Sequence, residues 1–582
     1  MNKRTRTACI VGLWCASAAG FAATAGEVEF ADTVRSYDAE RSTITHFYNL
    51  TWSDTRSERL AKLSTAWQAT LATQDFNALD QGGRIDWLLL NEQLNYELAK
   101  TAQDRVRLAQ IAELVPFRSI IEDLEVARWR KAPMDPAAAA AALAAVPEQI
   151  RNVRTRLDQG RKDTADAKAG DQTPLKISPL LAHRAARTTD GIRNGLKSWH
   201  EAYAGSQPDF SWWLKSPFEE TDKALEDYSK FLREEIAGLK GKPEDPLLGE
   251  ALGAEGLTRD LALEYLPYSA AELLAIGERE FAWCEARMKE AARAMNLDDD
   301  WHSALARVKS VHAAPGKQDD FIAEQAAEAI AFVKQRDLVT VPALCEETWR
   351  ISMISTETQK LMPYVAYDGM NMLVAFARDD MNQADKLMSM RGNNRHFTRL
   401  TTAHELIPGH HLQAYFAQRY RPYRSLFWTP FFVEGWALYW EMALWDHGYA
   451  RSPEDQIGML FWRMHRAARI IVTLKFHLGQ MTPAQMVDFL VERVGHERLG
   501  ATSEVRRFIG GDYSPLYQCG YMVGGLQLRA LAKEMTANGA MTVKQFNDAV
   551  LRLGPIPIEM IRASLRNLPL TRESRTQWRF DG

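Results

Sequence analysis

Three histidines and two glutamates in the second half of the chain have the side chains that a zinc hydrolase needs. Glu405 directly follows His404, and His410 and His411 come six and seven residues after His404. Glu434 follows His410 by 24 residues. Two neutral imidazoles and one carboxylate can hold Zn2+, while a second carboxylate can accept a proton from water. If these side chains converge, we expect the chain to be a hydrolase.

The spacing of these histidines does not fit a straight helix. Residues 397–407 place apolar side chains at helical intervals, and His404 continues that stripe, so we expect it to point inward. On a straight helix His410 would lie roughly 240° around the axis from His404 and about 9 Å along it. Pro408 cannot donate to the carbonyl of His404, and the glycine after it tolerates unusual backbone angles. A break is therefore expected here, but the spacing alone does not choose between His410 and His411.

Glu434 belongs to a second apolar helix. The pair Thr429-Pro430 predicts the first turn of that helix, and its inward face contains both Glu434 and Glu441. An unpaired buried carboxylate is costly, so such groups are usually paired or bound to metal. We expect Glu434 to be a metal ligand, and Glu441 either to orient a ligating imidazole or to form a structural ion pair. The alternative for Glu434 is an ion pair with one of three arginines, Arg463, Arg466 or Arg469.

Two tyrosines are candidate hydrogen-bond donors to the oxyanion that forms when a carbonyl is attacked. Ser514-Pro515 predicts a helix start, and Tyr517 and Tyr521 lie four residues apart on one face of that helix. Gly520 and Gly524 share this face and allow a neighbouring backbone to approach closely. We favour Tyr521 as the donor. The alternative is that both tyrosines only pack against another helix.

Other polar residues of this region have simpler expected roles. His465, His477 and His496 are expected in the core or on the surface, without a part in the site. Arg506 and Arg507 are expected to form a charged pair on a solvated helix face, although they would also suit a substrate carboxylate. The chain has no Gly-x-Ser-x-Gly motif and no cysteine beside a histidine, so a serine or cysteine hydrolase ranks last.

The string HELIPGHHLQ, followed by EGWALY, resembles the bacterial family called domain of unknown function 885, which is grouped with the gluzincin metallopeptidases. Related peptidases contain His-Glu-x-Gly-His, and dipeptidyl peptidase III contains His-Glu-x-x-Gly-His; the final Gly-His corresponds to Gly409-His410. The segment Tyr-Gln-Cys-Gly-Tyr is similar to the tyrosine segment of thimet-type oligopeptidases. The resemblance covers roughly residues 30–575. It implies zinc ligands at His404, His410 and Glu434, a general base at Glu405, and His411 as the alternative second histidine or as a residue near the substrate.

These features predict an exported zinc peptidase with Zn2+ as its cofactor, and the resemblance implies short peptides as its substrates. Two alternatives stay open: a catalytically silent homologue that binds peptides, and a zinc hydrolase of non-peptide amides or esters. The 582-residue chain has a formal net charge of −4 and no long basic run, so nucleic acid is not an expected partner. The cysteines after the leader, Cys284, Cys345 and Cys519, are far apart and are expected to be buried apolar residues.

Helical periodicity predicts a mainly α fold, and the resemblance implies a large gluzincin-like fold with a small β-sheet or hairpin beside the active-site helix. Helices are predicted at Asp86–Lys100, at Ser216–Lys240 and in an alanine-rich run from Pro136 to Ala145. The best strand signals, Met362–Tyr367 and Met372–Ala377, flank a turn-forming Asp-Gly pair. An exposed strand there would hold an extended peptide by main-chain hydrogen bonds; the alternative is a structural hairpin.

The chain is expected to contain a signal peptide and two regions. Residues 1–25 combine a basic start, an apolar stretch and an Ala-x-Ala pattern, so we expect cleavage and a periplasmic or secreted product. The alternative is an uncleaved membrane anchor. A bulky tryptophan before Cys15 argues against a lipoprotein site. We expect a helical N-terminal region at 26–245 and a catalytic region at 246–582, without membrane contact once the signal is removed.

Overall fold

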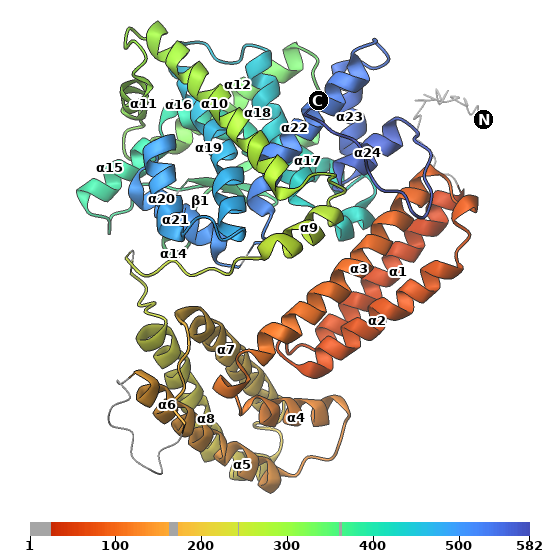
Figure 1. Ribbon diagram of the computed structural model, residues 1–582, viewed down its shortest axis with the longest axis vertical. Coiled ribbons are helices and arrows are strands. Elements are labelled where there is room, and N and C mark those ends of the chain that lie inside the picture. Colours follow the sequence, from red (N-terminus) through yellow and green to blue (C-terminus); the bar gives the residue numbers. More distant parts are fainter. Residues whose placement is uncertain (1–24, 162–172, 243, 360–363, 512, 582) are drawn as a thin grey trace, which may run out of the picture.

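The computed structural model describes residues 25–161, 173–242, 244–359, 364–511 and 513–581. It is mainly helical with one three-stranded sheet, which confirms the predicted class. A large helical body contains the later part of the chain, three long helices flank it, and a second helical lobe lies beside both (Figure 1). Within the described ranges, every helix is too short or too polar to span a bilayer. The predicted signal peptide lies outside the described residues, apart from Ala25.

The three flanking helices are α1 (Ala25–Phe47), α2 (Asp54–Thr73) and α3 (Gln81–Ala109). The predicted helix at 86–100 lies within α3, whose first turn is capped by the Asp80 carboxylate accepting from Gly83 N at 2.7 Å. These helices share the larger hydrophobic core with the body. A fully buried ion pair between Arg424 Nε and Asp86, 2.8 Å apart, joins α3 to the body.

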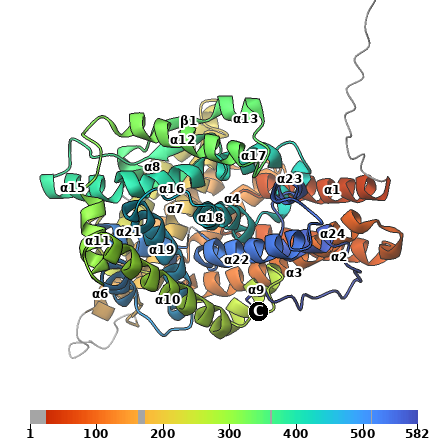
Figure 2. The same cartoon turned by 90° about the horizontal axis from the view of Figure 1, so that it is seen from above.

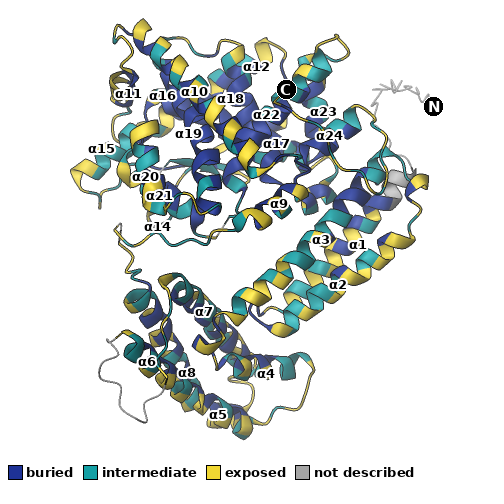
Figure 3. Cartoon of the chain, in the orientation of Figure 1, coloured by how far each residue is buried: buried dark blue, intermediate teal, exposed yellow. Residues whose placement is uncertain are grey.

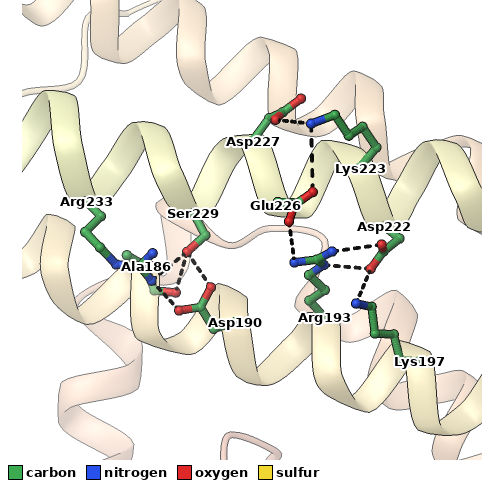
Figure 4. Close-up of polar contacts among 10 residues, drawn as sticks. All are labelled: Ala186, Asp190, Arg193, Lys197, Asp222, Lys223, Glu226, Asp227, Ser229 and Arg233. Atoms are coloured by element: carbon green, nitrogen blue, oxygen red, sulfur yellow. Dashed lines mark hydrogen bonds and ion pairs between the residues drawn. The ribbon is translucent and has the colours of Figure 1, made fainter. Parts of the chain in front are cut away.

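The second lobe has its own hydrophobic core. It consists of α4 (Arg118–Trp129), α5 (Pro136–Ala144), α6 (Val146–Arg161), α7 (Pro179–Glu201) and α8 (Pro208–Phe231). The alanine-rich α5 confirms its prediction. Polar pairs between α7 and α8 reinforce the apolar contact: Arg193 binds both carboxylate oxygens of Asp222 at 2.7 and 3.0 Å (Figure 4). The predicted boundary at residue 245 lies in a segment without helix, residues 237–252, in which residue 243 is not described.

The predicted start of a helix at Ser216-Pro217 is wrong. Helix α8 begins at Pro208 and contains Pro217 in its interior. Pro208 is placed where its missing N–H costs no hydrogen bond, and the buried Phe210 and Leu214 already follow the helical period. The hydroxyl–proline pair at Ser216 therefore imitates a start signal inside a longer amphipathic helix.

The sheet contains β1 (Arg350–Met353), β2 (Val365–Tyr367) and β3 (Asn371–Val374) in the order β1-β3-β2. The hairpin of β2 and β3 is antiparallel and confirms the prediction, with Gly369 at φ 99° in the turn. Strand β1 pairs in parallel with β3 and was not predicted. Strand β2 therefore forms one edge of the sheet.

The body is built around α16 (Arg395–Glu405), α17 (His410–Ala417), α18 (Pro430–Asp446), α19 (Pro453–His477) and α22 (Tyr517–Thr536). Seen from above, α16, α18 and α22 lie in adjacent rows (Figure 2), and buried residues concentrate where these helices meet (Figure 3). The other helices are α9 (Gly253–Leu263), α10 (Ala270–Ala294), α11 (Trp301–Lys309), α12 (Gln318–Gln335), α13 (Ala343–Thr348), α14 (Thr356–Gln359), α15 (Gln383–Gly392), α20 (Pro483–Phe489), α21 (Arg498–Ile509), α23 (Val543–Leu553) and α24 (Ile558–Leu565).

Glycines bring the backbones of α18 and α22 into contact. A Cβ added to Gly435 would lie 2.7 Å from Gly524 Cα, and one added to Gly524 would lie 1.8 Å from Phe431 O. A Cβ on Gly520 would meet Pro430 at 2.9 Å. Any larger side chain would separate the two helices, so the predicted close approach is confirmed. Helix α18 starts at the predicted Thr429 cap, whereas α22 starts at Tyr517, three residues after Ser514.

Candidate metal centre

A break between α16 and α17 returns His410 to the side of His404, as the proline and glycine predicted. Helix α16 ends at Glu405 and α17 starts at His410. Gly409 N donates to Ala403 O at 3.0 Å, so the chain turns back tightly over the end of α16. A Cβ on Gly409 would lie 1.7 Å from His404 O, which leaves room for glycine alone. The imidazole rings of His404 and His410 lie 4.8 Å apart between centroids.

The predicted ligand side chains converge at one buried point. Glu434 Oε2, from α18, lies 3.6 Å from His404 Nε2 and 3.2 Å from His410 Nε2. Ligand atoms of His404, Glu405 and His410 also lie within 4.8 Å of one another. Glu405 thus faces the same point, next to the two imidazoles. The arrangement can hold a metal ion with three side chains and leave a second carboxylate beside it.

These distances suit a zinc ion. Two ligands bonded to one tetrahedral zinc at about 2.0–2.1 Å lie roughly 3.3 Å apart, which is close to both separations measured from Glu434 Oε2. That oxygen is buried and accepts no hydrogen bond from any described group. Buried oxygens are usually bonded, so this one is suited to a cation. The set of two imidazoles and one carboxylate is also a zinc donor set.

His411 lies away from this point. Its Nδ1 lies 3.0 Å from the Tyr367 hydroxyl, and its Nε2 lies 3.0 Å from Cys345 O. Burial lowers the pKa of His411, so the ring is neutral. Both ring nitrogens of His411 therefore have protein partners, and the contact with Tyr367 ties His411 to β2 near the site.

Glu441 contacts both of the groups that the sequence suggested as alternatives. Its Oε1 lies 2.7 Å from His404 Nδ1 and 3.4 Å from an Arg466 nitrogen. A hydrogen bond to Nδ1 leaves Nε2 of His404 directed toward Glu434. Glu434 forms none of the arginine pairs considered for it, because Arg463, Arg466 and Arg469 pair with Glu280, Glu441 and Glu504.

Exchanging Glu441 for glutamine is expected to weaken zinc binding by about 10- to 100-fold, the usual contribution of a partner that orients a ligating imidazole. Competition with a chromogenic chelator measures the affinity. The matched control is Asp86→Asn, which removes another buried carboxylate paired with an arginine. It should lower stability and leave zinc affinity unchanged. Equal zinc affinity in Glu441→Gln and the wild type would contradict the orienting role.

Charge in the centre favours a cation. Burial alone would lower the pKa of His404, but the adjacent carboxylates of Glu434 and Glu441 raise that pKa to about 9. Burial alone would raise the pKa of Glu434, but His410 and His404 hold it well below its ordinary value. The negative field that favours a proton on His404 equally favours a divalent ion at the same place.

Both predicted tyrosines line the centre. The Tyr517 hydroxyl donates to Glu434 Oε1 at 2.5 Å. The ring of Tyr521 stacks against His404, with centroids 6.2 Å apart and planes 13° apart. Desolvation by burial raises the pKa of both phenols, so both remain donors at neutral pH. The glycines of α22 therefore pack against α18, while its tyrosines face the place where His404, His410 and Glu434 converge, called the metal point below.

A pocket of about 160 Å³ opens beside the centre. Glu405 lines it from α16, and Val365, Ala366 and Tyr367 of the edge strand β2 line it from the sheet. Asp368 N donates to Asn371 O and Ala375 N donates to Tyr364 O, so the main-chain groups of Val365 and Tyr367 point to the free edge. The pocket thus combines the metal point with a strand edge that no other described strand covers.

Several residues in the pocket wall were not expected there from the sequence. Arg507 was expected on a solvated face, but its side chain is only 18% exposed and pairs with Glu504 at 2.8 Å. The buried His465 also contacts Glu504, at 3.2 Å, and borders the same cluster. Arg466 and Arg469 line the pocket too. The sequence feature that could have placed these arginines in the pocket is their helical spacing on the otherwise apolar α19. Charged residues in such a helix must find buried partners.

Comparisons with known proteins agree with this architecture. The family model described as "Bacterial protein of unknown function (DUF885)" matches residues 48–565. No curated protein matches the sequence. A presumed lipoprotein of unknown function from Shewanella oneidensis has a solved structure that superposes with a TM-score of 0.67 at 17% identity, covering 92% of this chain and 99% of that one. A presumed lipoprotein from Colwellia psychrerythraea gives 0.57 at 16% identity, covering 93% and 99%. These likenesses show a shared fold, and the family match shows that the chain belongs to the DUF885 family of bacterial proteins.

Proposed function

We propose that the protein is an exported zinc-dependent peptidase of the gluzincin type. The observation that supports this most strongly is the convergence of His404, His410 and Glu434, with Glu405 at the same point. Three zinc ligands with a free carboxylate beside them are the composition of a hydrolytic site, whereas structural zinc sites use four protein ligands. Zinc bound here would polarise a carbonyl and lower the pKa of water toward about 7.

Glu405 is the proposed general base. It lies at the end of α16, buried and facing the pocket, where it would accept a proton from water and pass it to the departing amine. Tyr521 is the proposed donor to the oxygen of the attacked carbonyl, with Tyr517, whose hydroxyl donates to Glu434 in this structure, as the second candidate. Glu441 holds His404 in the orientation that leaves Nε2 free for the metal.

A peptide fits this pocket better than a compact ester or amide. The free edge of β2 presents the N–H and C=O of Val365 and Tyr367 along one wall. An extended peptide would pair with this edge as an added strand and be aligned past the metal point. The two solved structures are of presumed lipoproteins, which supports an envelope location and the proposed export.

The proposal is tested on the purified protein with a library of short peptides. We expect about one zinc ion per chain by elemental analysis, peptide cleavage seen by mass spectrometry, and loss of cleavage after dialysis against a chelator that zinc reverses. Bound zinc with peptide binding but no cleavage would identify a silent peptide-binding homologue. Cleavage of small esters or amides, with every peptide intact, would identify the non-peptide hydrolase. A protein without zinc affinity would contradict all three.

A further inference from the structure

The wall of the pocket formed by α19 and α21 is rich in guanidinium groups. Arg466 and Arg469 come from α19 and Arg507 comes from α21, and all three line the pocket that contains the metal point. The exposed fractions of their side chains are only 6%, 3% and 18%. Two buried cations and one partly buried cation in one wall require negative partners, because an uncompensated buried charge is costly.

Among the described residues, only two carboxylates pair with these three arginines. Glu504 pairs with both Arg469, at 2.9 Å, and Arg507, at 2.8 Å. Glu441 pairs with Arg466 at 3.4 Å. The other two carboxylates of the pocket, Glu405 and Glu434, face the metal point, where a divalent ion would balance their charge. One positive charge of the wall therefore has no counterpart among the described residues.

The histidines next to this wall do not change its balance of positive and negative charges. His465 lies 3.2 Å from Glu504, and His496 Nε2 lies 2.9 Å from His465 Nδ1. Burial lowers the pKa of both imidazoles, with His496 at about 3, so both are neutral. Among described groups, none accepts a hydrogen bond from Arg469 Nη1 or Arg507 Nε, which are buried donors. The wall thus has both a charge and hydrogen-bond donors to offer an anion.

The arginines lie close to the metal point. The guanidinium carbon of Arg469 lies 4.3 Å from the centre of the Tyr521 ring, and that of Arg466 lies 4.7 Å from it. The ring of His404 also neighbours Tyr521, with centroids 6.2 Å apart. Since an extended residue spans about 3.3–3.6 Å, a group held by the arginines would be no more than about three residues from a bond at the metal point.

We propose that this arginine wall binds the free α-carboxylate at the C-terminus of a peptide, so that the enzyme removes residues from that end. The inference rests on the proposed peptidase function and names its substrate class. A carboxylate supplies the negative charge that the described residues of the wall lack, and its two oxygens match the planar fork of a guanidinium. The distance from the wall to the metal point sets the length of the released fragment.

The test compares three N-acetylated pentapeptides on the zinc-loaded protein: a free acid, its C-terminal amide, and an amide whose last residue is glutamate. We expect kcat/KM to be about 100-fold higher for the free acid than for the plain amide, as for a buried charge-assisted hydrogen bond. Mass spectrometry should show cleavage within three residues of the C-terminus. Equal rates for acid and amide would overturn the inference, and so would a preference for the glutamate amide over the free acid, which would assign the wall to an acidic side chain.

Variants of the two adjacent arginines supply the control. Arg507→Gln should remove most of the preference for the free acid, chiefly through KM, and Arg507→Lys should restore part of it. Arg506→Gln is the matched control, because Arg506 points elsewhere and donates to Asp245 O; it should keep the full preference. Circular dichroism and zinc content verify that each variant is folded. An unchanged preference in Arg507→Gln would overturn the inference.

The outcome stays separate from the fate of the peptidase proposal. If the zinc-loaded protein cleaves none of the peptides, the proposed function fails, and calorimetric binding of the free acid and the amide then tests the wall alone. Tighter binding of the free acid in the wild type, lost in Arg507→Gln, would support carboxylate recognition. Equal binding of the two peptides would reject it.

Discussion

Glu405→Gln is expected to lower kcat for peptide cleavage by about 10²- to 10⁴-fold, the usual contribution of a general base, while zinc stays bound at wild-type stoichiometry. Glutamine keeps the size of the side chain but cannot accept the proton from water. The three proposed ligands, His404, His410 and Glu434, are untouched by this exchange. Steady-state kinetics on a cleaved peptide, together with elemental analysis of the same preparation, measure both quantities.

Two other outcomes would change the assignment of Glu405. Its carboxylate lies within 4.8 Å of both imidazoles, so it is also close enough to be considered as a ligand. If Glu405→Gln loses zinc, Glu405 holds the ion and another group must accept the proton. If the variant keeps zinc and full activity, Glu405 has no part in the reaction. KM should change little, because the side chain is not proposed to bind the peptide.

His410→Ala and His411→Ala should differ sharply although the two residues are adjacent. Loss of His410 removes an imidazole whose Nε2 lies 3.2 Å from Glu434 Oε2. We expect zinc affinity to fall by more than the roughly 10- to 100-fold that an orienting partner contributes, and activity to fall with it. Loss of His411 removes bonds to Cys345 and Tyr367 and leaves the metal point intact, so one zinc per chain should remain.

Zinc titration of both variants, with thermal unfolding in parallel, distinguishes metal loss from misfolding. His411→Ala should unfold at a lower temperature than the wild type, since a buried carbonyl loses its donor. It thereby controls for any general instability of α17. Equal zinc loss in the two variants would contradict the distinction between the two histidines, and loss in His411→Ala alone would exchange their roles.

The break in the metal segment could be predicted because it is a local property of the chain. Proline and glycine between the two histidines act on the backbone directly, whatever surrounds them. The cap at Thr429 and the hairpin turn at Gly369 are local in the same sense. Which histidine lies beside His404 was not a local property, because Cys345 and Tyr367, distant in sequence, occupy both ring nitrogens of His411 and His410 packs against His404.

Features that depend on distant contacts were missed for the same reason. Strand β1 is short and partly exposed, and only its parallel pairing with β3 makes it a strand. Arginine is a residue type usually found on the surface. Arg507 lines the pocket because it pairs with the buried Glu504 one turn earlier, which also pairs with Arg469 of α19. Ser216-Pro217 is a correct start signal by local rules, which the longer amphipathic pattern of α8 overrides.

The glycine contact between α18 and α22 has a consequence for how relatives of this protein can diverge. It locks Glu434 and the two tyrosines into one rigid unit, because neither helix can shift without a backbone collision. New substrate specificities would then have to arise in the other parts of the pocket lining, in the strand edge and in α21. The part of the pocket built by α18 and α22 would stay the same among relatives, and the rest could change which substrate the pocket binds.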